Sequence, residues 1–544
     1  MEIFCRKARG SLPEETRPFI KGAFILAAAA LFIKILSAVY RVPFQNIVGD
    51  TGFYIYQQVY PLYGIAYVLA STGFPVIISR IVAAKDQQNK QSVINKLQAA
   101  FIVLMFVGLG LFSFFFFGAN MIARWMGDPL LGPVIQVTAF PFLLLPFLSL
   151  WRGIFQGNGN MVPTALAQVI EQVFRVAAIL LISFLLVDKG YSFYEVGRGT
   201  WAGAVVGSAA GAVLLAIFAG RNIRIFINAV RLPFHEFVAV GKLVLVHGTA
   251  ICFSGLLLIL FQLVDSLNMY SLLLHSGMES VDAKVLKGVF DRGQPLIQLG
   301  TTIVGAMSLA LVPAIAAAWS QGNIGILQKK MESTIKLSAV IGAGAAIGLM
   351  NIIKPTNMML FKNQDGSLTL GILAAAIFFA SMVMTFTGIL QGMGAALVPA
   401  KYLLVGIACK YVLNTWLVPQ YGAFGAALAT NIGMGVIFIL LLNELKKRFP
   451  VHMVIFKTLP RLLMACTAMT AVLQVWLFLF EVCGLEGRLW STVAALGGVL
   501  VGGFIYISFL LYSNLFDNEE LKHVPFYAKA TAFRWRTTEE GRRK

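Results

Sequence analysis

Long apolar runs, separated by short polar segments, recur from near the start of the chain almost to its end. A helix needs about 20 apolar residues to cross the roughly 30 Å hydrocarbon core of a bilayer. Fourteen runs reach that length, at residues 19–40, 53–83, 97–121, 130–150, 161–187, 200–220, 237–267, 289–318, 335–353, 367–390, 397–416, 423–442, 460–480 and 489–511. The pattern predicts an all-α polytopic membrane protein with fourteen transmembrane helices.

Two of these runs contain residues that interrupt a regular helix. The second run includes Pro61, Gly73 and Pro75, and the eighth includes Pro295 and Gly300. Proline removes a backbone donor and kinks a helix, and such breaks within a membrane are tolerated where the backbone lines protein or a cavity. We therefore expect both spans to be bent or broken.

Composition supports a membrane protein and gives it an orientation. The chain has 544 residues, of which 58% are hydrophobic and only 12% charged, against about 25% charged in soluble domains. This excludes a soluble enzyme, and the net charge of +19 indicates basic cytoplasmic loops and contact with anionic membrane lipids rather than nucleic acid. With the N-terminus inside, most Lys and Arg fall on one side, which predicts that both termini are cytoplasmic.

The chain repeats a motif. The sequence GIFQGNG at residues 153–159 recurs as GILQGMG at residues 388–394, and Pro61 and Pro295 lie in nearly the same register. The motif by itself is also typical of helix caps at tight turns. Shared landmarks at one offset favour two six-helix lobes, related by an axis along the membrane normal, around a central cavity with alternating access.

The repeat sets the predicted domain limits. They are a cytoplasmic N-terminus at 1–18, a first lobe at 19–231, a second lobe at 232–445, two further helices at 446–512 and a basic cytoplasmic tail at 513–544.

Ionisable side chains inside spans are functional candidates, because each costs about 2.5–3.5 kcal/mol to insert. Lys34 and Arg41 are seven residues apart, and at about 100° per residue they point the same way within roughly 20°. With Ser37 between them they form a cationic stripe on the first span, and Arg292 begins the eighth. We expect Lys34, Arg41 and Arg292 to be the cations of the cavity. Secondary candidates for the cavity are Gln57, Glu171, Arg175, Gln262, Asp265, Asp291 and Lys410.

Several alternatives stay open for these charges. Arg41 and Arg292 lie near span ends, where an arginine also reaches the headgroups. Glu171 and Arg175 have the spacing of an intrahelical ion pair. Asp265 could neutralise Arg292 or Lys34 or bind a coupling cation, and the sequence shows no partner for Lys410.

Nothing in the sequence indicates an enzyme. The five cysteines are scattered and form no CxxC pair, and the five histidines lack the spacing of metal ligands. HExxH, GxSxG and Walker sequences are absent. We therefore expect no catalytic residues, no metal and no cofactor.

Three local sequences resemble those of the multidrug/oligosaccharidyl-lipid/polysaccharide (MOP) exporter superfamily. They are the stretch from Phe32 to Arg41, the Gly73-Phe74-Pro75 sequence, and Asp291-Arg292 followed by Pro295. Within this superfamily the chain is similar to the polysaccharide-transporter branch, which contains the lipid II flippases and stage V sporulation protein B. The resemblance implies a flippase that carries an undecaprenyl-pyrophosphate-linked glycan, foremost lipid II, to the outer leaflet of the bacterial cytoplasmic membrane.

The same resemblance implies essential cations from the first, second and eighth spans. Lys34, Arg41 and Arg292 take such places, whereas the middle of the second span has Tyr63 in place of a cation. Cell-wall synthesis proteins are implied as further partners. Two alternatives remain: export of another undecaprenyl-pyrophosphate-linked polysaccharide unit, and cation-coupled export of drugs.

Overall fold

The structure is helical throughout its described part. A computed structural model describes residues 17–84, 90–220, 233–449, 451–513 and 515, and no strand occurs in these ranges. Nearly all of the predicted N-terminal segment and of the basic tail lie outside the described residues. The prediction of an all-α membrane protein is confirmed.

The first half of the chain supplies nine helices to the described part. They are α2 (Arg17–Val39), α3 (Arg41–Val68), α4 (Phe74–Ala83), α5 (Lys90–Phe117), α6 (Ala119–Trp125), α7 (Gly132–Ala139), α8 (Pro141–Gly157), α9 (Val162–Asp188) and α10 (Phe193–Ala219), with a π-helical segment η3 (Leu69–Gly73) and a 3-10 turn η4 (Pro129–Leu131).

The second half continues in the same way. Its elements are α11 (Phe234–Lys242), the π-helical η6 (Leu243–Gly248), α12 (Thr249–His275), α13 (Ser280–Asp291), α14 (Gly293–Ser320), α15 (Ile324–Asn351), α16 (Ile353–Phe361), α17 (Ser367–Ala374), α18 (Ala376–Gly392), α19 (Leu397–Lys446), α20 (Val451–Val482) and α21 (Arg488–Tyr512).

Twelve helical segments of the described chain are long and apolar enough to cross a membrane. Two of them, Ala28–Ala83 with 56 residues and Leu397–Lys446 with 50, are long enough for two crossings each. Each contains a glycine with positive φ, Gly49 at 68° and Gly422 at 56°, where the chain folds back on itself. Each is therefore a helical hairpin. The predicted count of fourteen spans stays a prediction.

Hydrogen bonds across the two hairpins show the reversal. The Tyr40 and Tyr56 hydroxyls lie 2.6 Å apart on either side of Gly49. The Tyr402 hydroxyl donates to Glu444 over 3.3 Å on either side of Gly422. Pairs so far apart in sequence meet only if the two arms run antiparallel.

The predicted breaks are located by the structure. In the second span the helix widens into η3, which ends at Gly73 just before Pro75. In the eighth span the break falls at Arg292, between α13 and α14, and α14 then runs on without interruption. A second π-helical segment, η6, lies in the seventh span, for which the sequence predicted no break.

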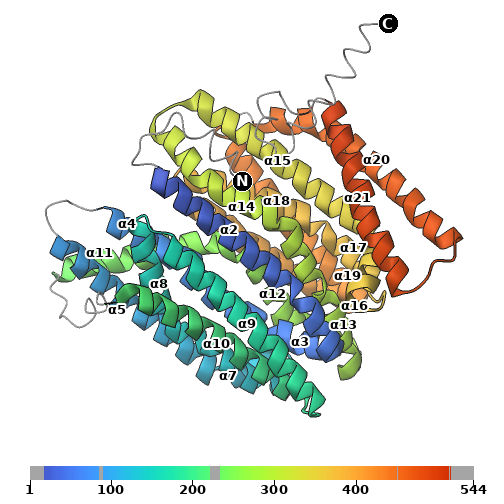
Figure 1. Ribbon diagram of the computed structural model, residues 1–544, viewed down its shortest axis with the longest axis horizontal. Coiled ribbons are helices and arrows are strands. Elements are labelled where there is room, and N and C mark those ends of the chain that lie inside the picture. Colours follow the sequence, from blue (N-terminus) through green and yellow to red (C-terminus); the bar gives the residue numbers. More distant parts are fainter. Residues whose placement is uncertain (1–16, 85–89, 221–232, 450, 514, 516–544) are drawn as a thin grey trace, which may run out of the picture.

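The helices gather in two groups (Figure 1). The group that contains α4, α5 and α7–α10 lies on one side, and the group from α14 to α21 lies on the other, with α2 between them. Helix α2 packs against both α9 and α14, while α12 packs against both α19 and α3. Helices α2, α3, α12 and α14 therefore line the boundary between the groups. The domain limits given from the sequence stay predictions.

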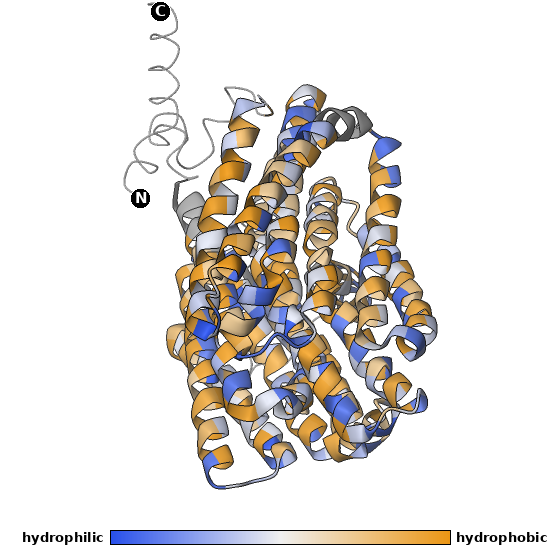
Figure 2. Ribbon diagram, turned by 90° about the vertical axis from the view of Figure 1, so that its right-hand side faces the viewer, coloured by the Kyte–Doolittle hydropathy of each residue, from blue (hydrophilic) through white to orange (hydrophobic). Residues whose placement is uncertain are grey.

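Hydrophobic residues predominate along most of the helices (Figure 2), and many large apolar side chains are exposed. Phe106, Ile217, Leu500 and Phe504 are each about 70% exposed. An exposed apolar surface of this kind is expected where lipid rather than water surrounds the protein.

The repeated glycine motif packs helices in the same way in both halves. A Cβ on Gly157 would lie 2.5 Å from the Val82 Cβ, and one on Gly392 would lie 2.7 Å from the Ile315 Cβ. Helix α8 thus closes against α4 as α18 closes against α14, in the manner of small residues at membrane helix contacts. The motif also ends each helix, since its last glycines, Gly159 and Gly394, have φ near 80°.

Candidate functional site

Buried charge is the feature of the interior that needs an explanation. Six Lys and Arg side chains of the described residues are buried, none more than 4% exposed: Arg41, Arg152, Arg175, Lys287, Arg292 and Lys410. A buried cation costs several kcal/mol unless an anion compensates it. A buried cation that has a carboxylate partner is therefore a structural charge, and a buried cation without one is a candidate to bind a ligand.

Four of the six form ion pairs with carboxylates. The pairs are Arg152–Glu171, Lys287–Asp291, Arg292–Asp50 and Lys410–Asp265, each with a shortest N···O distance of 2.6 Å. Each of these cations is neutralised within the protein.

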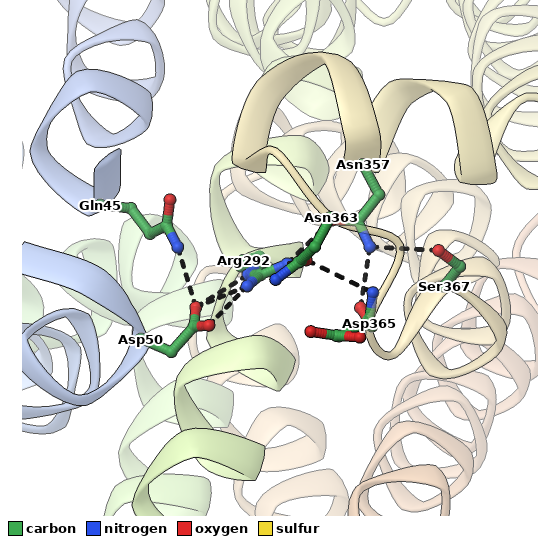
Figure 3. Close-up of polar contacts among 7 residues, drawn as sticks. All are labelled: Gln45, Asp50, Arg292, Asn357, Asn363, Asp365 and Ser367. Carbon is green, nitrogen blue, oxygen red and sulfur yellow. Dashed lines mark hydrogen bonds and ion pairs between the residues drawn. The ribbon is translucent and has the colours of Figure 1, made fainter. Parts of the chain in front are cut away.

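Arg292 has the most complete set of partners. Its Nε and Nη2 donate to the Asp50 carboxylate over 2.6–3.0 Å, and its Nη1 donates to Asn357 and Asn363 (Figure 3). Gln45 donates to the same carboxylate over 2.9 Å. We call these five residues the Asp50–Arg292 cluster. It ties the turn of the α2–α3 hairpin to the start of α14.

Arg41 has no carboxylate partner among the described residues. Its Nη1 donates to Gln298 Oε1 over 3.1 Å, and its guanidinium lies 4.3 Å from the centre of the Tyr60 ring. Its Nε and Nη2 are buried without a hydrogen-bond partner. Two donors of a fully buried guanidinium are thus unused.

Lys34 lies on the same stripe and is also unpaired in the described chain. Its side chain is exposed, and its ammonium would lie 3.0 Å from a Cβ placed on Gly305 of α14. Arg41 meets the same helix at Gln298. Because Gln298 and Gly305 are spaced by seven residues, as Lys34 and Arg41 are, both cations meet one face of α14. Lys34 and Arg41 thus lie along the same helix, α14, while their role as cations of a cavity stays a prediction.

Arg175 joins this stripe from α9. It donates to the Tyr63 hydroxyl over 2.8 Å, to Ser37 over 3.4 Å and to Gln172. Its Nε has no partner, and its guanidinium lies 5.1 Å from the centre of the Tyr63 ring. Ser37 lies between Lys34 on α2 and Arg41 at the start of α3. We call Lys34, Ser37, Arg41 and Arg175 the α2 cation site.

Tyrosines from α3 surround the site. Tyr56, Tyr60, Tyr63 and Tyr67 recur at helical spacing, and Tyr56 stacks on Trp201 at 4.6 Å. The rings of Tyr60, Tyr63 and Tyr67 face the guanidinium groups of Arg41 and Arg175, which lowers the cost of burying charge without neutralising it. Sequence reasoning missed this stripe, although the spacing of the tyrosines was a readable signal.

Comparison with known proteins gives the family. Residues 19–319 match the family described as polysaccharide biosynthesis protein. The chain belongs to this family. The chain is also 41% identical to the uncharacterized membrane protein YabM of Bacillus subtilis, over 96% of this chain and 97% of that protein.

A second relative is named for a cargo. The chain is 25% identical to the lipid II flippase MurJ of Bacillus subtilis, over 90% of this chain and 94% of that protein. As a member of a polysaccharide biosynthesis family with such relatives, the chain is a membrane transporter of the flippase type and not an enzyme.

Two solved structures share the fold. A multidrug resistance MATE family transporter of the MOP superfamily, in an inward-facing conformation, has a TM-score of 0.61 at 16% identity and covers 78% of this chain and 99% of that one. Lipid II flippase MurJ in an inward closed conformation has a TM-score of 0.60 at 15% identity and covers 91% and 99%. The predicted resemblance to the MOP superfamily is confirmed at the level of the fold.

One predicted ion pair of this transporter is wrong. Glu171 does not pair with Arg175, one turn along α9; its carboxylate accepts from Arg152 over 2.6 Å and from Ser208 over 3.1 Å. Arg152 comes from α8 and also donates to Ser71. It was missed because the predicted fourth span stopped at residue 150.

The open question about Asp265 also has an answer. Its carboxylate accepts from Lys410 over 2.6 Å and from Asn414 over 3.1 Å. Neither Lys34 nor Arg292 reaches it. Lys410 thereby gains the partner that the sequence could not identify.

Three other candidates take different places. Asp291 pairs with Lys287 on its own helix, which leaves no free charge at that position. Gln57 and Gln262 are buried, and in the described structure neither side-chain amide nitrogen has a hydrogen-bond partner. Among the described residues no group of His, Cys, Asp and Glu could hold a metal ion.

The chemistry of the α2 cation site follows from its members. It offers ammonium, guanidinium and hydroxyl groups, and no carboxylate bonds to its cations in the described structure. Such a set of donors has the chemistry that suits an anion. Its place between α2, α9 and α14 puts it where the two helix groups meet.

Proposed function

We propose that this transporter carries the head group of an undecaprenyl-pyrophosphate-linked oligosaccharide, most specifically the peptidoglycan precursor lipid II, from the inner to the outer leaflet of the cytoplasmic membrane. One observation carries the proposal. Lys34, Arg41 and Arg175 are cations at the boundary of the two helix groups without a carboxylate partner among the described residues. The relation to a protein named lipid II flippase supports the choice of cargo.

The head group has the chemistry that this site lacks. A pyrophosphate diester carries about two negative charges, which need matching cations once the group leaves water for a low-dielectric interior. Arg41 has two free donors with which to bind it in a bidentate manner. Lys34 adds a point charge at a position exposed to an incoming ligand.

The position of the site fits alternating access. Helix α2 packs against α9 in one group and α14 in the other, so rocking of one group against the other changes which side reaches the site. The prenyl tail stays in lipid while the head group crosses. We place both termini in the cytoplasm on the asymmetry of Lys and Arg.

Arg292 takes part in a later step of this proposal. In the present conformation Asp50 neutralises it, so Arg292 becomes available to the cargo only when the Asp50–Arg292 cluster opens. The cluster holds α3 to α14, and its opening would accompany the movement of one helix group relative to the other.

A second cargo has a specific observation behind it. Identity to YabM is 41% and identity to MurJ is 25%, so a different undecaprenyl-pyrophosphate-linked glycan is the second candidate. The same cations would bind it. Cation-coupled drug export is less well supported, because its acidic candidates Glu171 and Asp265 are neutralised by Arg152 and Lys410.

The test is outer-leaflet exposure of lipid II in cells that are depleted of their own flippase and express this protein. The wild type should restore exposure and Arg41→Ala should not, while Lys189→Gln, an exposed charge beyond the end of α9, should behave as the wild type. No exposure with wild-type protein present in the membrane would exclude lipid II. Accumulation of another prenyl-linked glycan in the absence of this protein would then point to the second cargo.

A further inference from the structure

Arg175 is buried without a neutralising charge, although an acid stands one turn away. The side chain is 4% exposed. Glu171 on the same helix is fully occupied, since its two oxygens accept from Arg152 and Ser208. The partners of Arg175 are the neutral groups of Tyr63, Ser37 and Gln172.

The surroundings of Arg175 connect it to Arg41. The Arg41 guanidinium lies 4.3 Å from the centre of the Tyr60 ring, and the Arg175 guanidinium lies 5.1 Å from the centre of the Tyr63 ring. Tyr60 and Tyr63 are one turn apart on α3, so the two guanidinium groups lie against the same stripe of tyrosines. An anion that binds there meets Arg41 from α3 and Arg175 from α9.

Releasing Arg175 to a ligand does not break an ion pair. Its Nε is already without a partner, and exchanging a neutral acceptor for an anionic oxygen strengthens each hydrogen bond. By contrast, Arg152 would leave Glu171 buried and uncompensated if it moved to a ligand. Of these two arginines, only Arg175 can serve a cargo at low cost.

We infer that Arg175 sets the preference of the α2 cation site for lipid-linked sugars joined through a diphosphate over those joined through a single phosphate. This inference rests on the proposed function. A monophosphate diester carries about one charge and a diphosphate diester about two. Lys34 and Arg41 suffice for the first, and the second phosphate binds Arg175, the remaining unneutralised cation of the site.

The experiment is a competition on the purified full-length protein, read by native mass spectrometry. Equal amounts of an undecaprenyl diphosphate sugar and an undecaprenyl monophosphate sugar with the same sugar compete for the protein. The ratio of the two complexes does not depend on the fraction of protein that is folded. The wild type should favour the diphosphate by about tenfold or more, the value of one charge-assisted hydrogen bond.

The variants separate a specificity role from a structural one. Arg175→Gln should lower the ratio close to one, with binding of the monophosphate sugar changed by less than about twofold. Arg175→Lys keeps the charge and loses the bidentate geometry, so its ratio should fall between the two. Lys189→Gln removes an exposed charge just beyond the C-terminal end of α9 and should retain the wild-type ratio.

The outcomes distinguish this inference from the proposed function. A wild-type ratio in both Arg175→Gln and Arg175→Lys overturns the inference and leaves the proposed function standing. If Arg175→Gln does not fold, an unchanged ratio in Arg175→Lys is sufficient to overturn the inference. Wild-type protein that binds neither lipid overturns the proposed function itself. A soluble nucleoside diphosphate sugar that competes as well as the diphosphate lipid shows that the site does not select a lipid cargo.

Discussion

The Asp50–Arg292 cluster and the α2 cation site each contain a fully buried arginine, but only the arginine of the cluster has a carboxylate partner. In the cluster the guanidinium of Arg292 is bound on both sides, by Asp50 and by two asparagines. In the site the guanidinium of Arg41 is equally buried, at 0% exposure, yet two of its nitrogens have no partner. Burial alone therefore does not mark a structural arginine or a functional one.

The difference lies in where the neutralising anion comes from. Asp50 supplies it to Arg292 within the protein, so the pair stabilises the arrangement of α3 and α14. The α2 cation site keeps an uncompensated charge, which is a cost to folding and a gain to the binding of an anion. The following substitutions test this contrast.

The largest effect is expected from breaking the cluster. Asp50→Asn leaves Arg292 buried without its anion and should destabilise the protein by about 3–5 kcal/mol. The double variant Asp50→Asn with Arg292→Gln removes both charges and should recover most of the loss. Thermal unfolding of the purified protein in detergent measures both changes. Equal losses in the single and double variants would show that the pair is not the source of the stability.

The next effect is on transport. Arg41→Gln and Lys34→Gln each remove a cation that we assign to the cargo, and each should slow lipid II translocation about tenfold to a hundredfold. Proteoliposomes with labelled lipid II give the rate. Unchanged rates in both variants would remove these residues from the binding site.

The smallest effect is expected on stability in the same site. Arg41→Gln removes a buried charge that no carboxylate compensates, so stability should stay within about 1 kcal/mol of the wild type or rise. The measurement is the same thermal unfolding in detergent. A loss as large as that of Asp50→Asn would place Arg41 with the structural charges and erase the contrast between the two regions.

Much of the fold was predictable because it depends on local pattern. Apolar runs placed the spans, and the glycines of the repeated motif pack α8 and α18 in matching ways. The seven-residue spacing predicted that Lys34 and Arg41 point the same way, and both meet α14, although Lys34 lies on α2 and Arg41 is the first residue of α3. The tight turns at Gly49 and Gly422 leave no long polar loop between the two helices of each hairpin, so the sequence did not show where one span ends and the next begins.

The partners of the charges were much less predictable. Asp265 and Lys410 are far apart in the sequence, and their contact depends on how α12 packs against α19. Glu171 has Arg175 one turn away on its own helix, yet it forms its ion pair with Arg152 from another helix. Local spacing cannot settle such choices, because tertiary packing decides which acid each cation meets.

The most direct test of the central claim is the rate of lipid II translocation in proteoliposomes for the wild type, Arg41→Gln and Lys189→Gln. The account predicts translocation by the wild type and Lys189→Gln, and a loss of about tenfold or more in Arg41→Gln without loss of folded protein. Equal translocation by all three would contradict the assignment of the α2 cation site to the cargo.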